Sequence, residues 1–154
     1  MSNMQKAERY IPWKDAKSWR CIRCGRCCTA YIVPLKNHEA ISLMRKYGPI
    51  LVYYNGRYYL SKKADGTCIF LTKINNIAYC MNYLERPLCC KLYPFHVSRR
   101  PIEGLDEKRA EVEVNEGKLY LYVDALCPGV GQGYLIENFL TKVIELWRIY
   151  EYTG

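Results

Sequence analysis

Alternating hydrophobic and polar positions predict two β-hairpins along the chain. Residues 50–60 contain two tyrosine-rich, β-prone runs, and Asn55-Gly56 separates them. Asn-Gly at this place is typical of a two-residue hairpin turn, because both residues readily adopt a positive φ. A second alternating pattern spans residues 111–123, on both sides of the polar segment 115–118. We therefore expect antiparallel strand pairs in both regions.

Hydrophobic residues at helical spacing predict two longer helices. The first is expected over about 38–47, where Asn37 is a suitable N-cap and Gly48-Pro49 stops the helix. The second is expected over about 134–151, near the end of the chain. The positions predicted to be buried are Ala40, Ile41, Met44 and Tyr47 in the first helix and Leu135, Phe139, Val143, Leu146 and Tyr150 in the second.

Shorter elements and loops connect these hairpins and helices. Residues 29–33 and 67–71 are β-prone and predict two short strands, and Asn75-Asn76 predicts a turn. This mixture predicts an α+β fold with short β-hairpins and a C-terminal helix. The segments expected to be irregular are an amphipathic lead-in over 1–20 whose tryptophans pack in the core, a charged surface loop over 98–110 and a glycine-rich loop over 127–133.

The length and composition are those of one small soluble domain. The chain has 154 residues, half of them hydrophobic, and no low-complexity tract or linker divides it. No run of 18 or more apolar residues occurs, and the polar start lacks the hydrophobic region of a signal peptide. We therefore expect residues 1–154 to form a single cytoplasmic domain that does not contact a membrane.

Nine cysteines are the chemically distinctive residues of this chain. Four of them, Cys21, Cys24, Cys27 and Cys28, fall within eight residues. Disulfides between cysteines so close in sequence would constrain little of the chain, and thiols stay reduced in the cytoplasm. Close spacing suits a metal, because a C-x-x-C turn brings two thiolates to one ion. The pattern therefore favours a zinc or iron–sulfur centre over disulfides.

The charge and the tyrosines leave a nucleic-acid hypothesis open. The formal net charge is +8, and fifteen tyrosines accompany the basic residues, a combination that suits RNA stacking. However, the pairs Tyr53-Tyr54 and Tyr58-Tyr59 lie in strand-like segments, where packing within a sheet explains them as well. Metal-bound thiolates would also offset part of the positive charge. Nucleic-acid binding is therefore the weaker hypothesis.

The C-x-x-C-x-x-C spacing of the first three cysteines matches loops that give three thiolates to one iron–sulfur cluster. Gly25 allows the backbone to turn tightly there and to bring amide donors toward the sulfur atoms. Cys28 is expected to point away from its neighbour Cys27 and so to serve a different centre. Without Cys89, the remaining eight cysteines suit two centres with four thiolates each.

Four sequence blocks resemble the CxxCxxCC family of zinc- or iron-chelating proteins, also called YkgJ-like cysteine-cluster proteins. Residues 21–28 fit its defining motif, and residues 65–71 are similar to its D-G-x-C-x-F-L segment. Residues 86–95 are similar to its R-P-x-x-C block, and residues 127–129 to its late C-P-G. The resemblance covers roughly residues 19–133. It implies metal or iron–sulfur binding, and it does not supply a substrate.

The resemblance also implies which cysteines bind the metal. Matching the Arg-Pro-x-x-Cys pattern from Arg86 makes Cys90 the ligand and leaves Cys89 free. Cys80 lies six residues before Arg86, one more than the resemblance leads us to expect, so its loop carries an insertion. The implied ligand set is Cys21, Cys24, Cys27, Cys28, Cys68, Cys80, Cys90 and Cys127.

These eight ligands are expected to form two neighbouring centres. The first three cysteines form a continuous tripod, and the C-P-G loop follows a hairpin and can return to it. Two zinc ions or two iron–sulfur clusters, such as 4Fe-4S, fit this division. The first centre is expected to contain Cys21, Cys24, Cys27 and Cys127, and the second Cys28, Cys68, Cys80 and Cys90.

Three other residues are weaker candidates near these blocks. Arg86 is expected to hold its loop through backbone carbonyls rather than to donate hydrogen bonds to thiolates. His96 could hydrogen-bond a thiolate, but eight cysteines make it a weak candidate for a ligand. His38 is expected to face solvent on the first helix.

Three functions of different classes follow. The first is an iron–sulfur protein for electron transfer, or a component of an Fe–S oxidoreductase, which would act with a redox partner. The second is a structural zinc protein whose surface binds another protein. The third is a basic protein that associates with RNA or the ribosome and is stabilised by metal. The sequence shows no Ser-His-Asp set or carboxylate pair that indicates a catalytic centre.

Overall fold

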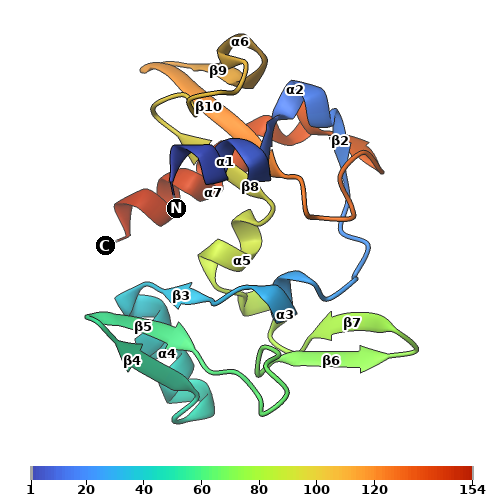
Figure 1. The fold of residues 1–154 in the computed structure, drawn as a ribbon. Helices are drawn as coiled ribbons and strands as arrows, with labels where there is room; N and C mark the ends of the chain where they lie inside the picture. The colour runs from blue at the N-terminus through green and yellow to red at the C-terminus, as the bar shows by residue number, and fades with distance from the viewer. Residues whose placement is uncertain (1, 154) are drawn as a thin grey trace. The chain divides into compact units, whose positions relative to one another are not determined.

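The computed structural model describes residues 2–153 and divides the chain into two compact units. The first unit comprises residues 1–22 and 92–147, and the second comprises residues 23–91 and 148–154. Each unit contains both helices and antiparallel strands, as Figure 1 shows. The α+β class predicted from the sequence is therefore confirmed.

The first unit is built on a four-stranded antiparallel sheet. Strand β10 (Gly117–Asp124) pairs with β9 (Glu111–Val114) along its first half. Along its second half it pairs with β1 (Tyr10–Pro12) and β8 (Phe95–Ser98). The hairpin predicted over 111–123 is thus confirmed. The helices and remaining strands of this unit are α1 (Asn3–Arg9), α2 (Trp13–Ala16), β2 (Ser18–Trp19), α6 (Glu107–Ala110), β11 (Tyr134–Leu135), the 3₁₀ helix η2 (Ile136–Phe139) and most of α7 (Leu140–Tyr152).

Strand β10 supplies more buried residues than any other element of the first unit. Leu121, Tyr122 and Val123 have no exposed surface. Strand β10 is the central strand of the sheet, and both α2 and α6 pack against it. The acidic residue Asp124 at its end is 1% exposed and accepts hydrogen bonds of 3.1 and 2.9 Å from the Arg9 guanidinium. This ion pair fastens the N-terminal segment to the sheet.

The segment 98–110 is not the exposed loop that its charge predicts. It contains α6 and buries two apolar residues, Ile102 and Ala110. The Ile102 N–H donates a hydrogen bond of 2.8 Å to the hydroxyl of Tyr122 in the core. Most residues of this segment are polar or charged, so a prediction based on charge misses the two apolar residues, Ile102 and Ala110, that are buried.

The C-terminal segment begins as extended chain rather than as a helix. Strand β11 pairs with β2, the 3₁₀ helix η2 follows, and only then does α7 begin at Leu140. A 3₁₀ turn holds fewer residues than an α-turn, so positions before Leu140 fall out of phase with the α-helical face. Of the predicted face, only Val143 is fully buried, and Leu135 is exposed. The buried residues are Ile136, Val143, Ile144 and Trp147.

The second unit combines a three-stranded sheet, a separate hairpin and one longer helix. The sheet has the order β3 (Pro34–Leu35), β5 (Arg57–Leu60) and β4 (Leu51–Tyr54). Strand β6 (Leu71–Ile74) pairs with β7 (Ile77–Cys80). The helices are α3 (Cys27–Ala30), α4 (Asn37–Tyr47), the 3₁₀ helix η1 (Tyr83–Glu85) and α5 (Leu88–Leu92).

Both turns predicted from asparagine in this unit are confirmed. Asn55 and Gly56 have φ values of 52° and 81° between β4 and β5. Asn75 and Asn76 have φ values of 51° and 63° between β6 and β7. Asparagine and glycine tolerate this left-handed region better than other residues, which is why such local signals are dependable.

The two short strands predicted beside the cysteines are not formed as predicted. Residues 29 and 30 belong to α3, and the strand begins only at Pro34. Residues 67–70 lead into β6 without forming a strand: Cys68 makes an isolated β-bridge with Lys62, and only Leu71 of the second predicted strand belongs to β6. The Cys68 N–H donates a hydrogen bond of 2.7 Å to the carbonyl of Cys28 instead of joining a continuous strand. Contacts between cysteine segments override local β propensity here.

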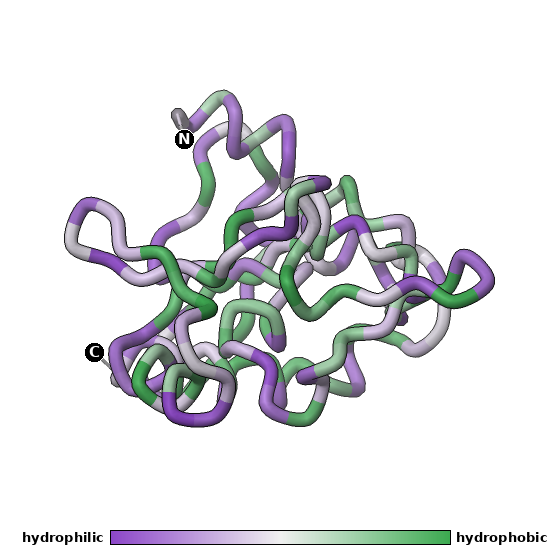
Figure 2. Tube along the Cα trace, turned by 90° about the horizontal axis from the view of Figure 1, so that it is seen from below, coloured by the Kyte–Doolittle hydropathy of each residue, from purple (hydrophilic) through white to green (hydrophobic). Residues whose placement is uncertain are grey.

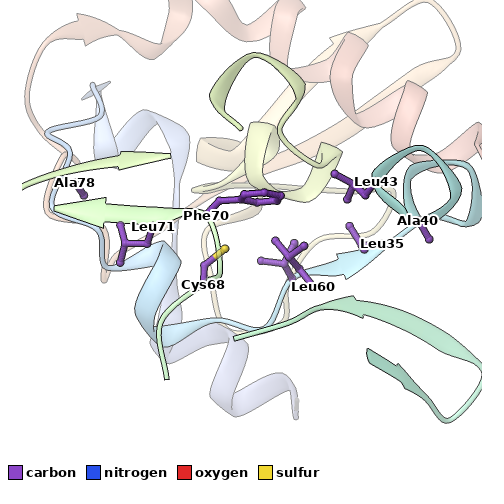
Figure 3. Packing of buried hydrophobic residues seen from close by; sticks show 9 residues of the cluster. Leu35, Ala40, Leu43, Leu60, Cys68, Phe70, Leu71 and Ala78 are labelled. Carbon is purple, nitrogen blue, oxygen red and sulfur yellow. The ribbon is translucent and has the colours of Figure 1, made fainter. Parts of the chain in front are cut away.

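The core of the second unit lies between α4, the sheet and the turn before β6, as Figure 3 shows. Helix α4 buries Ala40 and Leu43, and its Tyr47 ring lies 5.0 Å from the Phe70 ring. The predicted face is therefore rotated, and Ile41 is 47% exposed. The buried cluster consists of Val33, Leu35, Ala40, Leu43, Leu60, Cys68, Phe70, Leu71 and Ala78.

Short hydrophobic stretches alternate with hydrophilic ones along the coloured part of the trace, as Figure 2 shows. No helix among residues 2–153 is long and apolar enough to span a membrane.

Candidate metal centre

Five cysteine thiols of the second unit lie close enough to influence one another's ionisation. Burial raises the pKa values of Cys68 and Cys80, and the neighbouring Cys90 raises both further. A hydrogen bond with Cys27 raises the pKa of Cys28, as do burial and the charges of its cysteine neighbours. We refer to these residues as the cysteine cluster: Cys27, Cys28, Cys68, Cys80 and Cys90.

Cys27 is the member of the cluster whose thiolate is favoured. Its hydrogen bond with Cys28 lowers the pKa of Cys27 to about 7, although burial acts in the opposite direction. Thiolates, not thiols, bind metal ions. The thiols of Cys27 and Cys28 influence each other's ionisation and are therefore neighbours, and their assignment to different centres stays a prediction from the sequence.

Backbone hydrogen bonds bring the first cysteine block to the other segments. The Ala78 N–H on β7 donates a hydrogen bond of 2.9 Å to the carbonyl of Arg23. The bond from the Cys68 N–H to the carbonyl of Cys28 joins the same block to the turn before β6. The Cys90 N–H is fixed within its own segment by the carbonyl of Pro87 at 2.9 Å. Residues far apart in sequence are therefore positioned by the backbone rather than by their thiols alone.

Arg86 places a positive charge beside the cluster and also holds its own loop. Burial raises the pKa of Cys80, and Arg86 opposes that effect by favouring the thiolate. Arg86 also opposes the raised pKa of Cys90, which is caused chiefly by its hydrogen bond with Cys89 and by burial. In addition, Arg86 Nε donates a hydrogen bond of 3.1 Å to the carbonyl of Tyr83, which confirms the predicted backbone contact.

Cys89 lies at the edge of the cluster. It is hydrogen-bonded to Cys90. Its own Sγ donates a hydrogen bond of 3.4 Å to the carbonyl of Pro34 on β3. Burial raises the pKa of Tyr150, and nearby Cys89 raises it further, so Cys89 also lies near that ring. Cys90, by contrast, influences three other thiols of the cluster. This arrangement supports Cys90 as the ligand that the resemblance implies.

The other three implied ligands lie outside the cysteine cluster. Cys24 belongs to the second unit, is exposed, and accepts a hydrogen bond of 3.5 Å at Sγ from the Arg26 N–H. Cys21 is exposed and Cys127 is partly buried, and both belong to the first unit. A common centre for these three cysteines stays a prediction from the sequence.

Within the first unit, the Cys127 loop packs against the residues that precede Cys21. The Arg20 N–H donates a hydrogen bond of 3.3 Å to the carbonyl of Gly129. A Cβ at Gly129 would lie 1.9 Å from the Arg20 carbonyl oxygen, so only glycine allows this approach. Trp19 Nε1 donates a hydrogen bond of 3.4 Å to Cys127 Sγ. The centres of the Trp19 and Phe95 rings lie 5.3 Å apart. The predicted core packing of this tryptophan is thus confirmed.

The donor set of the cysteine cluster fits zinc or an iron–sulfur cluster. No three His, Cys, Asp or Glu side chains within the described residues 2–153 have metal-binding geometry as they stand. The cluster nevertheless gathers soft sulfur donors, partly buried, beside a cationic arginine. Rotation about the Cα–Cβ bond moves a thiol without moving the backbone. The backbone positions therefore decide whether the cluster suits a metal.

Comparison with known proteins decides the family. Residues 20–127 match the CxxCxxCC family, whose description is "putative zinc- or iron-chelating domain". The chain belongs to the CxxCxxCC family. The resemblance noted in the sequence is confirmed, and the family description supports metal binding without deciding between zinc and iron.

This CxxCxxCC protein is also similar to an archaeal protein. It is 33% identical over 164 residues to the uncharacterized protein MJ0661 of Methanocaldococcus jannaschii, covering 97% of this chain and 78% of that protein. No solved structure matches it. The comparisons therefore support a metal-binding domain and no particular reaction.

Two residues that the sequence analysis missed hold the cysteine loops of this CxxCxxCC protein in place. The Glu39 carboxylate on α4 accepts a hydrogen bond of 2.7 Å from the Leu88 N–H at the start of α5. Asn82 is 3% exposed. Its side chain accepts a hydrogen bond of 2.9 Å from the Tyr47 hydroxyl and donates one of 3.0 Å to the carbonyl of Glu85. The insertion after Cys80 was the one sequence signal near Asn82. No sequence signal marked Glu39, because its partner Leu88 lies far from it along the chain.

Neither histidine belongs to the cysteine cluster. The His96 ring stacks on Tyr10 at 4.9 Å, and burial, with Lys6 and Arg9, lowers the pKa of His96. His38 is exposed on α4, as predicted. The cysteine cluster therefore contains thiols and no imidazole.

Gly25, inside the CxxCxxCC motif, lets the first block approach the β6–β7 hairpin. Its φ is +76°, and a Cβ there would lie 3.0 Å from Ala78 Cβ and 3.2 Å from Lys73 Cε. Gly66 has a similar φ of +84°, but a Cβ there would meet nothing within 4 Å. The two glycines thus differ in the contact and share the backbone conformation.

Replacement of Gly25 by alanine is expected to lower the free energy of unfolding by about 2–4 kcal/mol, because a left-handed alanine costs about 1–2 and the contact adds strain. The matched Gly66→Ala variant should lose only about 1–2 kcal/mol, from the conformation alone. Urea denaturation of both variants measures the difference. Equal losses would show that the close approach at Gly25 does not hold the first block in place.

Proposed function

We propose that this protein binds zinc or an iron–sulfur cluster through the cysteine cluster of its second unit. The observation that carries the proposal is the gathering of five thiols from four segments, namely α3, the turn before β6, β7 and α5. Apolar packing alone does not require buried thiols to be neighbours. A shared metal does, since four thiolates from separate segments must meet at one centre.

Five thiols are one more than a four-thiolate centre needs. Cys27 is the member that the sequence assigns to the other centre, with Cys21, Cys24 and Cys127. We retain that division as part of the proposal, with Cys27 adjoining the cluster's own ligands. Those proposed ligands are Cys28, Cys68, Cys80 and Cys90.

The finer function depends on the metal. An iron–sulfur cluster would supply a one-electron redox centre, and the protein would then act with a redox partner. Zinc has no redox chemistry in proteins and would instead stabilise a surface that binds a protein or RNA. Both forms require reduced thiols, as in the cytoplasm. The residues of the chain have the same task in either case, which is to supply thiolates and to keep Arg86 near their negative charge.

Anaerobic purification followed by metal analysis and absorption spectroscopy tests the proposal. Iron with acid-labile sulfide and visible charge-transfer absorption would identify an iron–sulfur centre. Zinc without visible absorption would identify the structural alternative. A protein that retains neither metal, and binds neither when reconstituted under reducing conditions, would contradict both.

A further inference from the structure

A pocket of about 200 Å³ in the second unit is not explained by metal binding. It lies where the end of β3, the start of α4 and the β4–β5 turn meet the ring of Tyr150. No cysteine lines it. Its charged lining residues are Lys36 and Arg57, and no acidic residue lines it.

The two cations of the pocket have no anionic partner among the described residues 2–153. Lys36 Nζ lies 4.1 Å from the centre of the Tyr150 ring. Neither Lys36 nor Arg57 forms an ion pair with another residue in the part of the chain that the structure describes. Two unpaired cations at one pocket favour a ligand with a negative charge, and arginine in particular suits the oxygen atoms of a phosphate.

An exposed aromatic side chain lies on the strand beside Arg57. Tyr54 on β4 lies directly opposite Arg57 on β5, so both side chains are on the same face of the sheet. Tyr54 is 69% exposed, whereas the ring of Tyr53 packs on Tyr58 at 4.8 Å. Packing within the sheet therefore explains Tyr53 but leaves Tyr54 without such a role.

We propose that this pocket binds a nucleotide. Lys36 and Arg57 hold its phosphate, and its base stacks on the exposed ring of Tyr54. A volume of about 200 Å³ is small for a complete ligand, and it suits the phosphate and sugar while the base remains outside. Stacking on one aromatic ring is worth about 1–3 kcal/mol per base and tolerates any base. The nucleotide is either a free mononucleotide or part of a single-stranded RNA.

Nuclear magnetic resonance titration of the full, metal-loaded chain with AMP tests the proposal. AMP should shift the amide signals of residues 34–37 and 56–57, and adenosine, which lacks the phosphate, should not. Arg57→Gln should weaken AMP binding at least tenfold. The matched control Arg45→Gln removes one charge from an exposed position of α4 and should weaken it less than twofold.

Two further probes separate the parts and the source of the ligand. Tyr54→Leu should weaken AMP binding but leave ribose 5-phosphate binding unchanged. A single-stranded RNA of about ten nucleotides should bind more tightly than AMP, and more weakly as salt rises, if RNA is the source. RNA that binds no more tightly than AMP would indicate a free nucleotide. The proposal is overturned if neither AMP nor RNA shifts residues 34–37 and 56–57, or if Arg57→Gln and Arg45→Gln weaken binding equally.

Discussion

Replacement of Cys90 by serine is expected to remove the metal from the cysteine cluster, and replacement of Cys89 by serine is expected to leave it bound. Cys90 influences the ionisation of three other cluster thiols, whereas Cys89 Sγ donates a hydrogen bond of 3.4 Å to the carbonyl of Pro34. Loss of a residue that only orients a ligand weakens metal binding about 10–100-fold, so loss of a ligand should weaken it at least a hundredfold.

The two variants are matched controls for each other. Each exchanges one sulfur atom for oxygen, in neighbouring residues of the same short helix. Metal content per chain after gel filtration, together with circular dichroism, measures binding and folding in the same samples. If Cys89→Ser loses metal while Cys90→Ser retains it, the order of the two residues is reversed and the ligand assignment fails.

Removal of the metal by a chelator under reducing conditions is expected to open residues 21–28 and 68–90. The buried core of the second unit is small, and Cys68 is itself one of its members. Four further cysteines of this unit, Cys28, Cys80, Cys89 and Cys90, pack against that core. Binding of structural zinc contributes about 10 kcal/mol or more to the folding of small zinc domains, so a unit built on metal loses most of its stability without it.

Hydrogen exchange measured before and after chelation tests this expectation within one molecule. Amide exchange in residues 68–90 should become much faster. Exchange in β10 should change little, because Leu121, Tyr122 and Val123 are fully buried in the first unit and no cysteine belongs to that strand. Unchanged protection of residues 68–90 after complete metal removal would refute a metal-dependent fold.

Local signals in the sequence predicted the hairpins and their turns. Asn55-Gly56 and Asn75-Asn76 adopt the positive φ values that these residue types favour, whatever lies around them. The strand pairs on either side follow from such turns. The family was also predictable, because its motif consists of fixed spacings within short blocks.

Features that depend on contacts between distant segments could not be predicted in the same way. The buried face of α4 includes Leu43 rather than Ile41, because the sheet and Phe70 decide which face is covered. Residues 67–70 form no strand because the Cys68 N–H bonds to Cys28. Neither partner is visible in the local pattern.

The candidate site shows the same division. Spacing identified the cysteines, but it did not show that the thiols of Cys27 and Cys28 influence each other's ionisation. Neighbouring side chains diverge in an extended strand, but these residues begin the short helix α3 after a left-handed glycine. Residue spacing alone does not specify this local backbone.

X-ray absorption spectroscopy of the anaerobically purified protein, at the zinc and iron edges, tests the central claim most directly. The account predicts a bound metal whose protein ligands are all sulfur, with metal–sulfur distances near 2.3 Å. Cys28→Ser, Cys68→Ser, Cys80→Ser and Cys90→Ser should each disturb that shell. A first shell dominated by nitrogen or oxygen, or one that none of these replacements changes, would contradict metal binding by the cysteine cluster.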